Sequence, residues 1–250
     1  MPSSPDIAVQ LYTVRSSLAS EPDATLARLA AIGLRVVEPF DLLRFRDALR
    51  DGLPRHGLTA GTAHADILDP DSDIDAIFEV ARELGIRTVI QAWLEPARFE
   101  TAEGIAAVAA DLAAAAARAA AFGIAVGYHN HQFELETRID GRHALEVLAD
   151  ELPPSVGLQV DTYWALVGGA DVPALLGRLG DRVFALHLKD GDGSLDTKRQ
   201  VPLGTGKLPV REILAAAPSA LRVLELDDTA GDLFDAVRIG HELLVELAGA

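Results

Sequence analysis

Two segments decide the fold of this chain: Val156-Gly157-Leu158-Gln159-Val160-Asp161 and Val183-Phe184-Ala185-Leu186-His187-Leu188. Both are short, mostly apolar runs with a residue able to bind a metal ion or move a proton at or next to the last position, Asp161 in the first and His187 in the second. Six other runs have the same form, at successive spacings of 26 to 38 residues. That spacing is about one strand, one helix and two turns. The eight end residues are Gln10, Glu38, His64, Gln91, His129, Asp161, His187 and Glu225.

Eight such units predict a parallel (β/α)8 TIM barrel, in which apolar strand bodies fill the core and strand ends face a shared cavity. Glycines that follow the helical segments and precede β-branched runs support this pattern. We expect one domain over residues 1–250, because this length is typical of one barrel. The expected strands are 7–11, 35–38, 59–64, 87–91, 124–129, 156–161, 183–188 and 221–226, and the clearest expected helices are 22–32, 42–55, 74–84 and 101–122.

The composition narrows the class of partner. The net charge of −16 disfavours nucleic acid, so a small polar sugar substrate is the better partner. The longest alanine-rich stretch is interrupted by charges, so no membrane span is expected. Residues 1–6 lack the features of a secretion signal, and the absence of cysteine fits a reducing cytoplasm. Apolar helix faces are compatible with a homo-oligomer.

Three of the strand-end residues suit a divalent metal ion. Asp161, His187 and Glu225 end successive strands and should be neighbours at the rim. Two carboxylates and an imidazole suit Mn2+, Co2+ or Zn2+, or Mg2+ if water completes the shell. The alternative for each residue is an ordinary strand-end hydrogen bond. Three on successive strands favour the metal site, with a carboxylate left to transfer a proton.

The strand around residue 128 carries two histidines. Alternation places His129 and His131 on one face of Tyr128-His129-Asn130-His131. His129 is a candidate fourth ligand and His131 a candidate hydrogen-bond donor to substrate, or the reverse.

These motifs resemble the sugar isomerase/epimerase barrels related to xylose isomerase and to the metal-dependent apurinic endonucleases. The resemblance covers essentially the whole chain, and its most specific pieces are 128–131, 157–161 and His187-Leu188-Lys189-Asp190; Gly204-Thr205-Gly206 fits the loop that often follows the seventh strand. It implies a metal held by Glu, Asp, His and Glu at the ends of strands five to eight. Three of these fall on Asp161, His187 and Glu225.

The chain departs from that pattern at two positions. The resemblance implies a glutamate at the position of His129, paired with the strand-eight glutamate as acid and base, so this chain lacks one carboxylate of that proton shuttle. A histidine base, a role for His131 or a one-base reaction with Glu225 are the alternatives. Trp164 stands where relatives often have another histidine, which argues against a second metal ion and against the endonuclease branch.

Several other residues have two readings each. Lys189 either polarises a carbonyl or holds a phosphate, or else forms a salt bridge with Asp190. Glu38, His64 and Gln91 are candidate substrate-binding residues, and the alternative is a strand-end hydrogen bond. Trp93 and Trp164 either stack on a sugar ring or pack beneath a loop. The sequence Gly204-Thr205-Gly206-Lys207 lacks the remaining glycine and Ser/Thr of a nucleotide-binding loop.

The leading function is therefore a metal-dependent isomerase or epimerase of a sugar or keto-sugar derivative, transferring a proton next to a carbonyl through a metal-stabilised enediolate. The first alternative is a lyase or dehydratase acting on keto-inositols or keto-glycosides. The second is a barrel that binds sugar without turning it over. We expect Glu225, His131 and Lys189 to be the catalytic residues.

Overall fold

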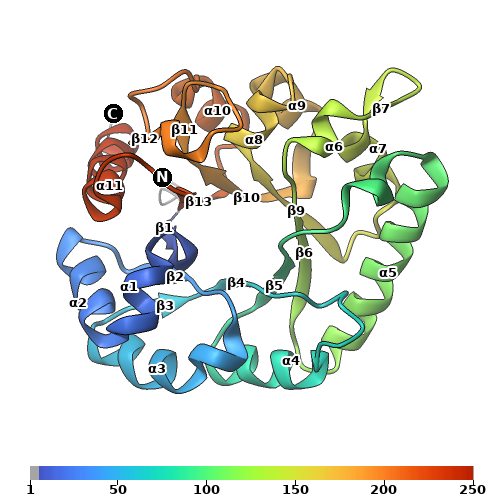
Figure 1. The fold of residues 1–250 in the computed structure, drawn as a ribbon. Coiled ribbons are helices and arrows are strands. Elements are labelled where there is room, and N and C mark those ends of the chain that lie inside the picture. The colour runs from blue at the N-terminus through green and yellow to red at the C-terminus, as the bar shows by residue number, and fades with distance from the viewer. Residues whose placement is uncertain (1–5, 250) are drawn as a thin grey trace.

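The computed structural model describes residues 6–249, so most of the N-terminal segment on which we expected no secretion signal lies outside the described part. Nine parallel strands form a ring that helices surround (Figure 1). Their order around the ring is β3-β2-β1-β13-β10-β9-β6-β5-β4. The bounds are β1 (Ile7–Gln10), β2 (Val36–Glu38), β3 (Thr59–Ala60), β4 (Thr62–His64), β5 (Thr88–Gln91), β6 (Ala125–His129), β9 (Val156–Asp161), β10 (Val183–Leu188) and β13 (Leu221–Leu224).

The ring closes because β3 and β4 are two halves of one barrel strand, interrupted at Gly61. β3 pairs with β2, and β4 pairs with β5. A bridge between Phe40 and His64, with the His64 amide donating to Pro39 O at 2.8 Å, joins β2 to β4. The predicted (β/α)8 barrel is confirmed. The expectation of one continuous strand over 59–64 was wrong, since Gly61 interrupts it.

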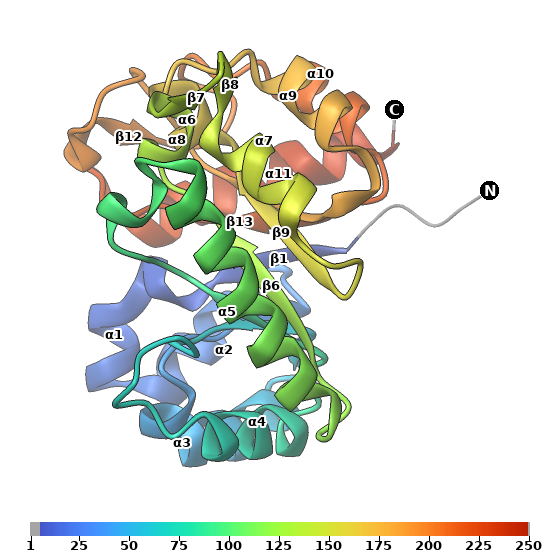
Figure 2. The same cartoon turned by 90° about the vertical axis from the view of Figure 1, so that its right-hand side faces the viewer.

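Helices form the outer layer and cover the strands from outside (Figure 2). They are α1 (Arg15–Ser20), α2 (Pro22–Ile32), α3 (Leu42–Arg55), α4 (Ile74–Glu83), α5 (Ala102–Ala120), α6 (Phe133–Glu136), α7 (Ala144–Glu151), α8 (Thr162–Val167), α9 (Val172–Leu179), α10 (Val210–Ala216) and α11 (Leu233–Gly249). Side-chain caps fix two predicted starts. Asp73 accepts from the Ala76 amide and Thr101 from the Gly104 amide. Gly33, at φ +112°, ends α2 in the left-handed region, as glycine does most readily.

Two small hairpins lie in loops outside the barrel sheet. The strands β7 (Arg138–Ile139) and β8 (Arg142–His143) pair antiparallel, and so do β11 (Asp190–Gly191) and β12 (Gln200–Val201). The second hairpin orders the start of the long segment 190–209, which follows β10. Among residues 6–249, no helix combines the length and apolar character needed to cross a bilayer.

The strand register places two pairs of predicted end residues side by side and staggers a third. Gln10 pairs with Glu38 and Asp161 with His187, whereas His129 pairs with Gln159, two residues before Asp161. Glu225 lies one residue beyond β13, and its amide donates to Leu188 O at 3.2 Å. The last strand is thus two residues shorter than expected, but it still delivers Glu225 to the same rim.

Candidate metal centre and cavity

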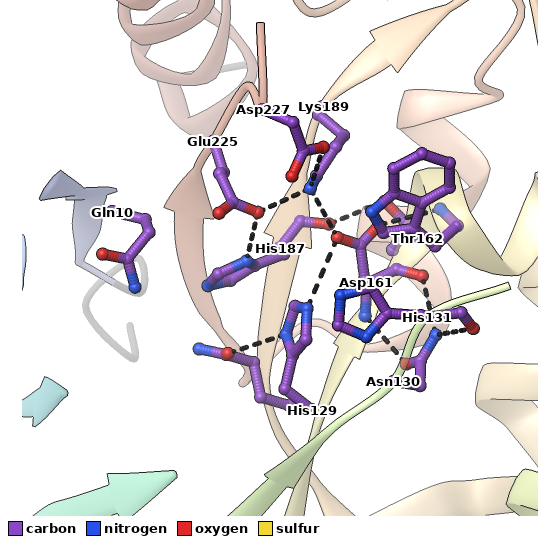
Figure 3. Close-up of polar contacts among 12 residues, drawn as sticks. Gln10, His129, Asn130, His131, Asp161, Thr162, His187, Lys189, Glu225 and Asp227 are labelled. Atoms are coloured by element: carbon purple, nitrogen blue, oxygen red, sulfur yellow. Dashed lines mark hydrogen bonds and ion pairs between the residues drawn. The ribbon is translucent and has the colours of Figure 1, made fainter. Parts of the chain in front are cut away.

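Four side chains from four adjacent strands converge at the carboxyl end of the barrel. One ligand atom each from His129, Asp161, His187 and Glu225 lies within 4.8 Å of all the others. All four residues are buried, with at most 5% of their surface exposed. Figure 3 shows them approaching a common region from β6, β9, β10 and the end of β13. The separation is short enough for one ion to contact all four.

Asp161 divides its two carboxylate oxygens between the fold and this cluster. Oδ1 accepts from the Trp164 amide at 2.8 Å and caps α8. Oδ2 lies 2.9 Å from Lys189 Nζ and accepts no well-directed hydrogen bond. Burial raises the pKa of Asp161 to about 6, while the charge of Lys189 opposes that rise. A buried carboxylate oxygen that has an ammonium charge beside it but no directed hydrogen bond is the kind of atom that a metal ion can bind.

His129 presents an unprotonated nitrogen to the same oxygen. Its Nδ1 lies 3.0 Å from Gln159 Oε1, and because an amide oxygen can only accept, Nδ1 carries the proton. Burial and the neighbouring His187 and His64 lower the pKa of His129 well below its ordinary value, so the ring is neutral. Its Nε2 lone pair then lies 3.8 Å from Asp161 Oδ2. Two acceptors that face each other fit a metal ion between them.

His187 is held between two carboxylates. Its Nε2 lies 2.6 Å from Glu38 Oε1 and its Nδ1 lies 2.8 Å from Glu225 Oε2. Burial would lower the pKa of this imidazole, but the charges of Glu225 and Glu38 raise it to about 10. Glu38 fixes the Nε2–H, as carboxylates behind metal-ligating histidines commonly do. Loss of the Nδ1 proton would leave a nitrogen lone pair on the side of Glu225. His187 could then bind a divalent ion together with the other three residues.

A layer of polar side chains inside the barrel supports Glu38, and two of its members, Thr62 and Gln159, were not among the predicted residues. Glu38 is fully buried and accepts from Gln10 at 2.9 Å, Thr62 at 2.5 Å and Gln159 at 2.8 Å. Burial would raise the pKa of Glu38, but His64, His187 and the hydrogen bond from Thr62 lower it to about 2. Because β2 and β9 are not neighbours, the bond from Gln159 crosses the interior of the barrel.

A signal for Gln159 was available in the sequence. It lies two residues before Asp161 on a strand, so it shares the inward face, and it is the only polar residue in that strand before Asp161. Its Oε1 also lies 2.6 Å from His64 Nε2. Gln159 therefore fixes the orientation of two histidine rings and binds Glu38 through its amide nitrogen.

Lys189 supplies a cation inside this site. Its Nζ lies 2.6 Å from Glu225 Oε2 and 2.9 Å from both Asp161 Oδ2 and Asp227 Oδ2. The alternative of a salt bridge with Asp190 was wrong, since Asp190 accepts backbone amides of its own loop instead. Asp227, which no sequence argument selected, completes the set of carboxylates around this ammonium group.

A cavity of about 610 Å³ opens above the cluster. Of the predicted residues, His64, Trp93, His129, His131 and Glu225 line it, whereas Glu38, Asp161, His187, Gln91, Trp164 and Lys189 do not. The side-chain amide of Gln91 hydrogen-bonds to the backbone. Its oxygen accepts from the amides of Ile67 and Leu68, and its nitrogen donates to Trp93 O at 2.7 Å. Trp93 is 45% exposed and forms part of the wall.

His131 lines this cavity, and its ring packs against two aromatic rings. Its ring stacks on Phe133 at 5.8 Å and on Trp164 at 6.5 Å. Burial and the charge of Lys189 lower the pKa of His131 to about 4, so the ring is neutral near pH 7. Glu134 accepts from the His131 amide at 2.9 Å and from Tyr128 Oη at 2.5 Å, which fixes the turn that carries His131.

Comparison with known proteins gives a family match and a set of similar folds. The model of the family described as "Xylose isomerase-like TIM barrel" matches residues 26–219. A search of curated proteins gives no significant match.

Among solved structures, a sugar phosphate isomerase/epimerase from Parabacteroides distasonis is 20% identical with a TM-score of 0.77, and the match covers 97% of this chain and 98% of that one. An IolI protein with a bound zinc atom is 16% identical with a TM-score of 0.71, covering 97% and 98%. An L-ribulose 3-epimerase is 17% identical with a TM-score of 0.71, covering 98% and 95%. At these identities the likeness shows the fold alone.

Proposed function

Because the chain belongs to the xylose isomerase-like TIM-barrel family, we propose that it is a divalent-metal-dependent isomerase or epimerase of a sugar or keto-sugar derivative. The reaction is proton transfer at a carbon next to a carbonyl. One observation carries the proposal: four metal-ligating side chains converge within 4.8 Å beside a cavity large enough for a small molecule. The zinc atom in the similar IolI structure and the epimerase among the similar folds are compatible with it.

The proposed ligands are His129, Asp161, His187 and Glu225. Two imidazoles and two carboxylates suit Mn2+, Co2+ or Zn2+, with Mg2+ as a weaker candidate. A bound ion would supply Lewis-acid polarisation of the substrate carbonyl. Glu38 and Gln159 hold the far nitrogens of the two histidine rings, which keeps their ligating nitrogens directed at the site.

Glu225 is the proposed proton acceptor. One of its carboxylate oxygens contacts His187 and Lys189, while the other points away from both (Figure 3). Glu225 lines the cavity, so it can reach a substrate C–H. The ammonium of Lys189 balances its charge, which makes Lys189 a positioning residue in this scheme.

His131 is the proposed second proton-transfer group. It lines the cavity as a neutral ring and so can both donate and accept a proton at a substrate hydroxyl. With His129 bound to the metal ion, His131 stands in for the second carboxylate that the family pattern implies. His64 and the exposed face of Trp93 are proposed to bind the rest of the sugar, the indole by stacking on its C–H face.

The test uses purified protein with its metal content measured before and after chelation. Incubation of ketoses in D2O should give deuterium at the carbon next to the carbonyl, detected by NMR. Glu225→Gln should lower exchange by about 10²- to 10⁴-fold with unchanged circular dichroism. Unchanged exchange in this variant would refute the role of Glu225. Failure of the protein to bind a divalent ion in stoichiometric amount would refute the metal site.

A lyase or dehydratase remains a second candidate because the cavity has a histidine, His129, where the family pattern has the second acid/base carboxylate. In such a reaction Glu225 would take the proton and His131 would protonate the departing hydroxyl. Mass spectrometry of the product separates the two, because dehydration removes about 18 mass units whereas isomerisation conserves mass.

A further inference from the structure

The loops that most often bind phosphate in this fold follow strands seven and eight of the barrel. In this chain they follow β10 and β13. If the substrate were a phosphate ester, free amide donors or basic side chains should be found there or in the cavity.

The loop after β10 does contain an anion cradle, but the chain fills it with its own carboxylate. Asp190 is fully buried. Its Oδ1 accepts from the amides of Gly191 at 2.8 Å and Leu208 at 2.9 Å, and its Oδ2 accepts from Gly204 at 3.0 Å and Gly206 at 2.9 Å. A Cβ at Gly206 would collide with Asp190 Oδ1, so the loop closes tightly around this group. These four donors are therefore committed to an internal anion.

In the loop after β13, several amides also donate to side-chain oxygens of the protein, and Asp232 caps the first turn of α11. The pairs are Leu226 N to Thr13 Oγ1, Asp227 N to Gln200 Oε1, Thr229 N to Asp228 Oδ1 and Asp235 N to Asp232 Oδ1. The start of α11 carries carboxylates where a phosphate would need positive charge.

The cavity wall has the wrong charge for a phosphate. Four carboxylates line it, those of Asp41, Asp66, Glu225 and Asp227, and within residues 6–249 its lining includes neither arginine nor lysine. Lys189 is 1% exposed and bound to three carboxylates, so it is not available to a distant phosphate group. A phosphoryl group carries about −1.5 to −2 charges at pH 7 and would be repelled.

The same wall suits an uncharged polyhydroxylated molecule. Carboxylates such as Asp66 accept hydrogen bonds from hydroxyls, and exposed rings offer faces for C–H groups. Tyr12 is 40% exposed and Trp93 is 45% exposed, and both line the cavity. Its volume of about 610 Å³ is in the range that encloses drug-sized ligands, which leaves space for a substituent on the sugar.

We infer that the substrate carries no phosphate group and is an uncharged sugar or glycoside. This inference rests on the proposed function and adds its substrate class. It separates the chain from any relative that acts on sugar phosphates, because the phosphate-binding positions of the fold are occupied by Asp190 and its neighbours.

The test compares matched ligands on the metal-loaded protein by isothermal titration calorimetry: D-fructose against D-fructose 6-phosphate, D-tagatose against D-tagatose 6-phosphate, and D-ribulose against D-ribulose 5-phosphate. In any pair that binds, the unphosphorylated member should bind at least tenfold more tightly. Inorganic phosphate at millimolar concentration should not compete. Equal or tighter binding of the phosphorylated member would overturn this inference and leave the proposed function standing. If no pair binds while the metal does, the proposed function fails as well.

A charge variant adds a second measurement. Asp66→Asn keeps a hydrogen-bond acceptor but removes one negative charge from the wall. The ratio of the Kd of the phosphorylated sugar to that of its unphosphorylated partner should therefore fall by at least threefold. Asp71→Asn, on the exposed surface outside the cavity lining, is the matched control and should leave the ratio unchanged. A ratio unaffected by Asp66→Asn would contradict electrostatic exclusion of phosphate.

Discussion

Replacing Lys189 by methionine should destabilise the metal-free protein strongly. Lys189 is 1% exposed and pairs with Asp161, Glu225 and Asp227 at 2.6 to 2.9 Å. Removing one member of a buried ion pair costs about 3–5 kcal/mol, because the remaining charges are left uncompensated. Asp227 is 25% exposed and can be hydrated, so we take the lower end, about 3 kcal/mol. For a chain of this size the melting temperature should fall by about 6–12 °C.

Thermal melts followed by circular dichroism, with EDTA and then with Mn2+ or Zn2+, measure this effect. A divalent ion should recover most of the loss in Lys189→Met, since it supplies positive charge to the same oxygens of Asp161 and Glu225. Lys198→Met is the control, because its ion pair with Asp228 at 2.6 Å lies on the surface and such pairs contribute little. If Lys189→Met melts with the wild type in EDTA, the ammonium does not balance the site and our reading of its charges is wrong.

Three further predictions concern the pH dependence and the packing of the barrel. Because the pKa of His187 is raised from 6.5 to about 10, its contribution to stability is complete below pH 6.5 and is lost as pH rises toward 10; the difference in melting temperature between the metal-free wild type and His187→Gln should shrink over that range, and a constant difference would contradict it. The pKa of Glu38 is lowered from 4.5 to about 2, so the difference in melting temperature between the wild type and Glu38→Gln should be full above pH 4.5 and shrink as pH falls toward 2. A difference that grows in acid would contradict this prediction. Gly157→Ala would place a Cβ 2.7 Å from the Phe184 ring and should lower the free energy of unfolding in urea by about 1–3 kcal/mol. Gly177→Ala, in open space on α9, should raise it by about 0.5–1 kcal/mol. Equal effects of the two substitutions would show that the Phe184 ring moves aside without cost.

The barrel could be predicted because its signals are local. Each strand joins an apolar body to a polar end, and the lengths of the intervening segments match one helix with its turns. Helix boundaries were predictable where a cap is written in the sequence, as at Asp73 for α4 and Gly33 after α2. The convergence of Asp161, His187 and Glu225 follows from topology alone, since the carboxyl ends of parallel strands meet at one rim.

The partners of charged groups were harder to predict, because they depend on side-chain direction across the barrel. Adjacency in sequence suggested Lys189 with Asp190, but successive strand residues point to opposite sides. Lys189 therefore joins carboxylates from β9 and the end of β13, while Asp190 turns into the 190–209 loop. Likewise, the hydrogen bond from Gln159 to Glu38 joins residues 121 positions apart and has no local signature.

The charge count at the site favours a divalent ion over a monovalent one. Four carboxylates, those of Glu38, Asp161, Glu225 and Asp227, surround two cationic groups, Lys189 and protonated His187, which leaves an excess of two negative charges. If His187 gives up its Nδ1 proton to become a ligand, the excess grows to three. A divalent ion then leaves one negative charge, which Asp227 can carry because it is the most exposed of the four carboxylates. A monovalent ion would leave two negative charges to be shared with groups that are almost wholly buried, where uncompensated charge is costly.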